Sequence, residues 1–117
     1  MRYIVFGIIA LSIFGHSCKK DKADEPIPFD CSDTLISFSA TIQPLVMGSC
    51  ATTGCHNNSG AGGYVFGNHA SIEVNKDIIL RTIRHEVGVV PMPVGTKLTA
   101  EQIQYFTCWV EQGALDN

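Results

Sequence analysis

The sequence contains no cluster of basic side chains. Eight Lys and Arg residues stand against eleven Asp and Glu residues, so the formal net charge of the 117-residue chain is −3. A domain that binds nucleic acid normally carries a basic patch or stripe on one face. The composition therefore predicts that nucleic acid is not a partner.

Long apolar runs and enzyme motifs are also missing. The apolar run at residues 4–14 is too short for a membrane-spanning helix, which needs about 20 residues. The chain has no internal repeat, no glycine motif of a phosphate-binding loop, and no paired carboxylates or nucleophile triad. We therefore expect no enzymatic activity and no small-molecule substrate.

The first segment has the form of a secretory leader. Arg2 precedes the apolar run, which ends at residues 15–18, Gly-His-Ser-Cys, before a charged stretch. Small residues leading into a cysteine resemble the lipobox of bacterial lipoproteins. The resemblance implies that residues 1–17 are a lipoprotein signal peptide and that Cys18 is lipidated; an ordinary signal peptide cut nearby is the alternative. We expect an exported chain, lipid-anchored to the bacterial outer membrane or to the periplasmic face of a membrane.

Residues 18–34 are charged and contain Pro26 and Pro28, which predicts a flexible tether. The folded domain is then expected at residues 35–117. A core formed by about 80 residues rarely stabilises itself without a disulfide, a metal or a cofactor.

The domain is predicted to be all-α, with four short helical pieces and no convincing strand. The first covers residues 38–47, although Pro44 is tolerated only in a first helical turn and so allows a later start. Residues 57–67 are rich in glycine and form a loop, and a helical turn covers residues 69–73. Asn75 is expected to cap a helix over residues 76–85. The inward face of this helix consists of Ile78, Ile79, Thr82 and Ile83.

The clearest helix lies near the C-terminus. Thr99 and Gln102 form a T-x-x-Q capping box, and Gly113 ends the helix. Its apolar stripe consists of Ile103, Phe106, Trp109 and Val110. We expect this stripe to cover the first helix.

Residues 50–56, Cys-Ala-Thr-Thr-Gly-Cys-His, carry the chemistry of the chain. Cys50, Cys55 and His56 form a C-x4-C-H pattern, a variant of the C-x-x-C-H site of covalent haem attachment. In that chemistry two thiols add to the haem vinyl groups as thioethers, and the histidine binds iron from one face. The histidine must follow the second cysteine directly, as it does here.

Met92 lies between Pro91 and Pro93, in a segment that is stiff and non-helical. A methionine in such a loop is poorly suited to core packing. It is well suited to holding a thioether at a fixed point.

From residue 38 to residue 114 the chain resembles the monohaem c-type cytochrome domain of class I. The shared features are a helix that ends in the C…C-H motif, a variable middle, a Met-Pro loop, and K-L-T-x-x-x-I followed by W-V-x-x-G-A. The resemblance implies a small bundle of three to five short helices around one covalently bound haem c. Cys50 and Cys55 would form the thioethers, and His56 and Met92 would be the axial iron ligands.

The same resemblance implies one-electron transfer between redox partner proteins, because iron with both axial positions filled has none open for oxygen or peroxide. It also implies that the first and last helices cross, which brings Cys31 near Cys108 for a disulfide. The alternative is a buried free Cys108 with Cys31 exposed in the tether. Arg81 and Arg84 are the nearest candidates to bind the haem propionates.

Other interpretations of the motif are open. Its three residues also suit a zinc site in which His69 or His85 is the fourth ligand. A Cys, His and Met set suits copper, and the two cysteines alone suit a plain disulfide. His69 or His85 is also an alternative to Met92 as the sixth iron ligand. The alternative functions are a haem-binding sensor or accessory module and a structural zinc-binding lipoprotein.

Overall fold

The computed structural model describes residues 29–117, and this part of the chain folds into helices without strands. The predicted all-α class is thus confirmed. The predicted signal peptide, residues 1–17, and the lipidation site Cys18 lie outside the described residues. Within residues 29–117 no helix is long and apolar enough to cross a membrane.

The first helix begins at Phe38, so the later start that Pro44 allowed is not adopted. Its first turn, η1 (Phe38–Ile42), is π-helical, and α1 (Gln43–Ser49) continues it directly. A proline ring normally clashes with the carbonyl four residues earlier. The wide π turn, closed by the Gln43 N–H on the Phe38 carbonyl, precedes Pro44 and leaves it in the first turn of the α-helical part.

Two short helices follow. A capping box between Asn68 and Ser71 starts α2 (His69–Glu73). Asn75 is the N-cap residue of α3 (Lys76–Ile83), as predicted, but its side chain makes no capping hydrogen bond. The Asn75 amide instead donates to the Ser71 carbonyl oxygen at 2.8 Å.

The end of α3 falls at Ile83, earlier than predicted. His85 adopts a left-handed backbone conformation with a φ of 58°, which stops the helix. The Glu86 N–H donates to the Arg81 carbonyl and the His85 N–H to the Thr82 carbonyl, both at 3.1 Å. This pairing is the Schellman motif, with histidine where glycine is usual.

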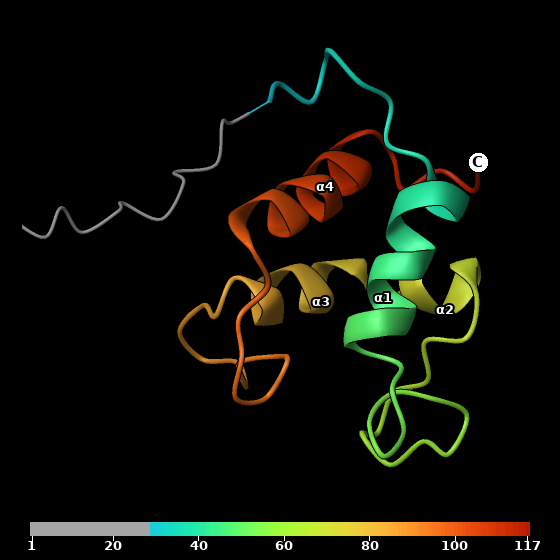
Figure 1. Ribbon diagram of the computed structural model, residues 1–117, viewed down its shortest axis with the longest axis vertical. Helices are drawn as coiled ribbons and strands as arrows, with labels where there is room; N and C mark the ends of the chain where they lie inside the picture. The colour runs from blue at the N-terminus through green and yellow to red at the C-terminus, as the bar shows by residue number, and fades with distance from the viewer. Residues whose placement is uncertain (1–28) are drawn as a thin grey trace, which may run out of the picture.

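The last helix, α4 (Ala100–Glu111), has the predicted capping box and is followed by Gly113 at a φ of 95°. Its stripe packs across η1 and against α3 (Figure 1). Trp109 is fully buried, its ring lies 5.8 Å from the Phe38 ring, and its indole N–H donates to the Leu115 carbonyl. Together these contacts form the centre of the core.

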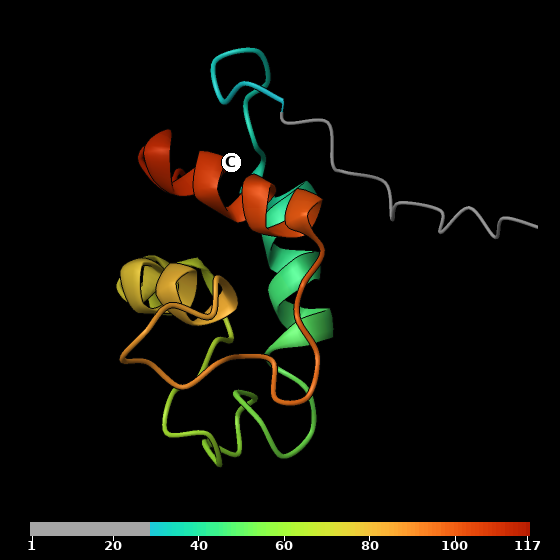
Figure 2. The same ribbon diagram turned by 90° about the vertical axis from the view of Figure 1, so that its left-hand side faces the viewer.

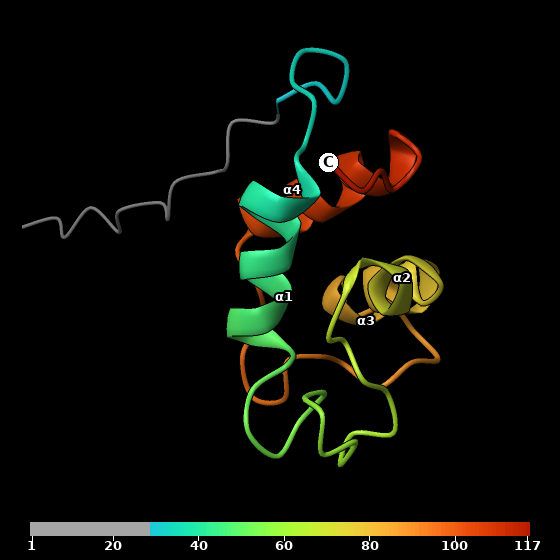
Figure 3. The same cartoon turned by 90° about the vertical axis from the view of Figure 1, so that its right-hand side faces the viewer.

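Both long connections lie at the same end of the molecule. In Figures 2 and 3, α4 crosses the upper end of the first helix, while the segments that follow α1 and α3 lie together below. The core therefore occupies one end of the bundle, and the two segments that carry the cysteine motif and Met92 meet at the other.

A disulfide joins Cys31 to Cys108, with their Cα atoms 4.9 Å apart. Cys108 is fully buried in α4. Phe29 lies beside the same helix, with its ring 5.2 Å from that of Tyr105.

Hydrogen bonds also hold residues 29–34 on α4. The Gln112 amide donates to the carbonyl oxygens of Cys31 and Thr34 at 2.6 and 2.9 Å, and its oxygen accepts the Ile36 N–H. This segment was predicted to belong to the tether of residues 18–34. The boundary at residue 35 is therefore set too late, because the folded unit includes the chain back to residue 29.

Replacing Cys31 by Ser is expected to lower the free energy of unfolding by about 4 kcal/mol, since the bridge closes a loop with a sequence separation of 77. Chemical denaturation followed by circular dichroism measures the change. Reductant should destabilise the parent but leave the variant unaffected. An unchanged unfolding midpoint in Cys31→Ser would show that the bridge does not stabilise the domain.

Candidate cofactor site

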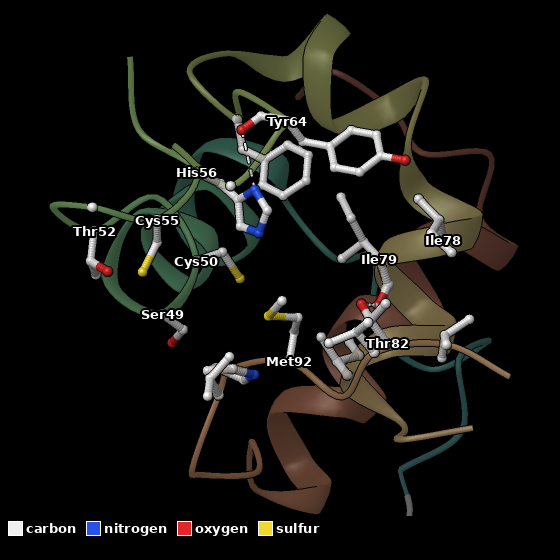
Figure 4. A pocket seen from close by; sticks show the side chains of 18 of the residues that line it. Ser49, Cys50, Thr52, Cys55, His56, Tyr64, Ile78, Ile79, Thr82 and Met92 are labelled. Atoms are coloured by element: carbon white, nitrogen blue, oxygen red, sulfur yellow. Dashed lines mark hydrogen bonds between the residues drawn. The ribbon is translucent and has the colours of Figure 1, made fainter. Parts of the chain in front are cut away.

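An apolar cleft of about 650 Å³ opens between the two segments at the lower end of the bundle (Figure 4). Its size lies within the range of about 300–1,000 Å³ that is usual for cofactor and ligand sites. Three parts of the chain line it: residues 49–66, the face of α3 predicted to point inward, and residues 88–94. The part of the chain described here contributes no charged side chain to this lining.

The cysteine motif begins where α1 ends. Cys50 caps the helix and donates its N–H to the Val46 carbonyl. A turn closed by the Cys55 N–H on the Thr52 carbonyl at 3.0 Å takes up the four intervening residues. The His56 N–H then returns to the Cys50 carbonyl at 3.1 Å. This bond brings the two ends of the motif to the same side of the cleft despite the longer spacing.

His56 is held with one ring nitrogen engaged and the other directed at the cleft. Its Nδ1 lies 3.1 Å from the Tyr64 carbonyl oxygen. Because a carbonyl oxygen only accepts, Nδ1 carries the proton in this bond and the lone pair of the neutral ring is on Nε2. Metal-binding histidines are usually oriented in this way. The imidazole is therefore prepared to bind a metal ion through Nε2.

Aromatic contacts fix the plane of the His56 ring. The Phe66 ring, which is buried, lies 4.7 Å from it and is tilted by 32°. The Phe66 N–H donates to the His56 carbonyl at 2.9 Å, so both the backbone and the ring of Phe66 hold it beside His56.

Met92 enters the cleft from the opposite segment. Its side chain is partly buried and points into the cavity toward which His56 Nε2 also points (Figure 4). The Met92 N–H donates to the Thr82 carbonyl at 3.1 Å, which ties the proline-flanked loop to α3. An imidazole nitrogen and a thioether sulfur thus face one space from two different loops.

Cys50 and Cys55 both line the cleft as free thiols. The plain disulfide between them is therefore not formed. Burial, and secondarily the neighbouring Cys55, raises the pKa of the Cys50 thiol to about 11. Cys50 is accordingly protonated at neutral pH, whereas Cys55 is exposed to solvent.

His69 and His85 lie away from the motif. His69 Nε2 is 2.7 Å from the Ala114 carbonyl oxygen, and its ring packs edge-on against Phe38 and Trp109. The lining formed by residues 29–117 includes neither His69 nor His85. Over the same range, no group of three or more His, Cys, Asp or Glu residues converges as a metal site. Within residues 29–117, therefore, neither His69 nor His85 lies where it could join the motif as a ligand or take the place of Met92.

Arg81 and Arg84 do not reach the cleft. Both pair with Glu86, at 3.3 and 3.8 Å, and Arg84 also donates to the Thr107 hydroxyl. In this arrangement the two side chains are directed toward Glu86 and α4, and their role as propionate partners stays a prediction.

The residues that orient His56 were missed in the sequence. Tyr64 and Phe66, with Gly62, lie in the glycine-rich loop of residues 57–67, for which the sequence predicted no contact with His56. An aromatic-x-aromatic pair after the glycines was the one available signal. The contacts that give these residues a role involve a main-chain carbonyl and a ring stack.

Comparison with family models, curated proteins and solved structures found no significant match for the chain. The function is therefore inferred from the chemistry of the cleft.

In protein with free thiols, iodoacetamide at about pH 8 should modify Cys55 well before Cys50, because the thiolate is the reacting form and burial keeps Cys50 protonated. Peptide mapping by mass spectrometry measures both rates. The difference should shrink as the pH approaches the Cys50 pKa of about 11. Equal rates at the lower pH would contradict the burial of Cys50.

Proposed function

We propose that this domain binds one haem c covalently and transfers single electrons between redox partner proteins, as a c-type cytochrome domain. One observation carries the proposal: a nitrogen donor, a sulfur donor and two free thiols line the same apolar cleft. The C-x4-C-H motif places the histidine directly after the second cysteine, as covalent haem attachment requires.

The residues fit the group. Cys50 and Cys55 would form the thioethers, and His56 and Met92 would bind the iron from opposite loops. Bound haem iron would supply reversible one-electron chemistry. The Tyr64 carbonyl keeps the Nδ1 proton of His56 in place, which fixes the ligating tautomer at Nε2. The isoleucines of α3 make one wall of the cleft apolar.

The ligand pair favours an electron carrier over a sensor or an enzyme. A thioether ligand stabilises ferrous iron and raises the reduction potential, and two protein ligands leave iron no open position. The lining formed by residues 29–117 contains no charged side chain. An apolar site also raises the reduction potential, because it disfavours the additional positive charge of ferric iron.

Redox partners would dock at the mouth of the cleft. Tyr64, Val90 and Val94 line the cleft and are also exposed, so they form an apolar rim. With a net charge of −3, the protein suits partners that meet this rim through apolar contacts or bring basic patches of their own. The leader and Cys18 add the proposal of an exported, lipid-anchored carrier.

Covalent attachment gives the first test. Protein purified from a host that matures c-type cytochromes should be red, and the colour should stay with the polypeptide in acidified acetone, because the thioethers are covalent. Absorption spectroscopy of the precipitated protein measures this. Colourless protein with one zinc ion per chain would overturn the proposal in favour of a structural zinc-binding lipoprotein.

Met92→Ala is expected to abolish the weak sulfur-to-iron absorption band of the oxidised protein and to lower the reduction potential, because iron loses its thioether ligand. The variant should keep its haem, since the thioethers and His56 are unchanged, and its open site should bind carbon monoxide. Met47→Ala is the control, since Met47 is exposed on α1 and does not line the cleft. An unchanged spectrum and potential in Met92→Ala would remove Met92 from the site; carbon monoxide binding by the parent would favour the haem sensor.

A further inference from the structure

The main chain at Gly62 lies against the His56 ring. A Cβ atom built at Gly62 would lie 2.7 Å from both Nδ1 and Cε1 of His56 and 3.2 Å from Nε2. Cβ atoms in proteins essentially never come closer than 3.0 Å to another heavy atom. Any larger residue at position 62 therefore has to displace either the ring or the loop.

Backbone conformation does not explain this glycine. Gly60 and Gly63 have positive φ angles of 66° and 80°, which favour glycine by themselves, but Gly62 does not. Close approach to the His56 ring is the contact that requires a residue without a side chain there.

The loop cannot move away easily, because it is bonded on both sides of Gly62. The Gly62 N–H donates to the Cys55 carbonyl at 3.1 Å, and the Phe66 N–H donates to the His56 carbonyl at 2.9 Å. The imidazole is the end of a side chain that one hydrogen bond and ring contacts hold, so its torsion angles adjust more easily than the loop, which two backbone hydrogen bonds hold. A methyl group at position 62 would therefore move the ring before it moves the loop.

We propose that Gly62 is a positioning residue for His56: its missing side chain lets the ring lie where Nδ1 reaches the Tyr64 carbonyl and Nε2 points into the cleft. This inference rests on the proposed function. A displaced ring would weaken the Nδ1 hydrogen bond, and an imidazole that has lost this bond gives less electron density to a metal bound at Nε2. A weaker electron donor stabilises ferric iron less and so raises the reduction potential.

The test compares Gly62→Ala with Gly67→Ala in the full, haem-loaded chain. Gly67 belongs to the same loop and also lacks a positive φ, and its added Cβ would meet only the side-chain oxygen of Asn58, at 3.3 Å. In Gly62→Ala we expect a higher reduction potential and, by proton magnetic resonance, roughly tenfold faster exchange of the His56 Nδ1 proton, the factor for one lost hydrogen bond. Gly67→Ala should behave as the parent in both measurements.

The possible results distinguish a failure of the proposed function from a failure of the role proposed for Gly62. A parent without covalent haem overturns the proposed function itself. A haem-loaded Gly62→Ala with parental potential and parental Nδ1 exchange overturns the role of Gly62, even if the variant melts earlier. If Gly62→Ala does not accumulate, the parent protein is measured instead. Exchange of its His56 Nδ1 proton that is slower than exchange of its surface amide protons supports the close packing of the loop on the ring. Exchange as fast as that of the surface amides overturns the proposed role of Gly62.

Discussion

The hydrogen bond between His56 Nδ1 and the Tyr64 carbonyl is the interaction on which the site depends. It fixes the tautomer of the ring and directs Nε2 into the cleft, so that the imidazole can bind a metal without reorganising. The neighbouring loop is shaped around this bond. Gly62 leaves room for the ring, Phe66 packs on it, and two backbone hydrogen bonds return the loop to residues 55 and 56.

The rest of the fold holds this loop opposite Met92. The core around Trp109 and Phe38 joins α4 to the first helix, while α3 contributes to both the core and the cleft. The disulfide between Cys31 and Cys108 secures the N-terminal segment to the buried side of α4. A small domain with a wide apolar cleft has little surface to bury by itself, and a covalently bound planar cofactor would fill that cleft and add its own burial.

Much of the secondary structure could be predicted because its signals are local. The capping box at Thr99 and Gln102, the stop at Gly113 and the inward face of α3 each depend on residues a few positions apart. The domain boundary could not be predicted in this way, because it depends on a distant contact. Residues 29–34 have the composition of a tether but are bound by Gln112.

The sequence alone determined the chemistry available to this protein: two thiols, an adjacent histidine and a proline-flanked methionine, together with the all-α class. These features depend on residue identity and short spacing, which the chain displays directly. Only the tertiary structure decided that His56 and Met92 face one cleft, that His69 and His85 lie outside it, and that a glycine-rich loop orients the imidazole. The physical reason is that main-chain carbonyls and steric gaps acquire their roles only when distant segments meet.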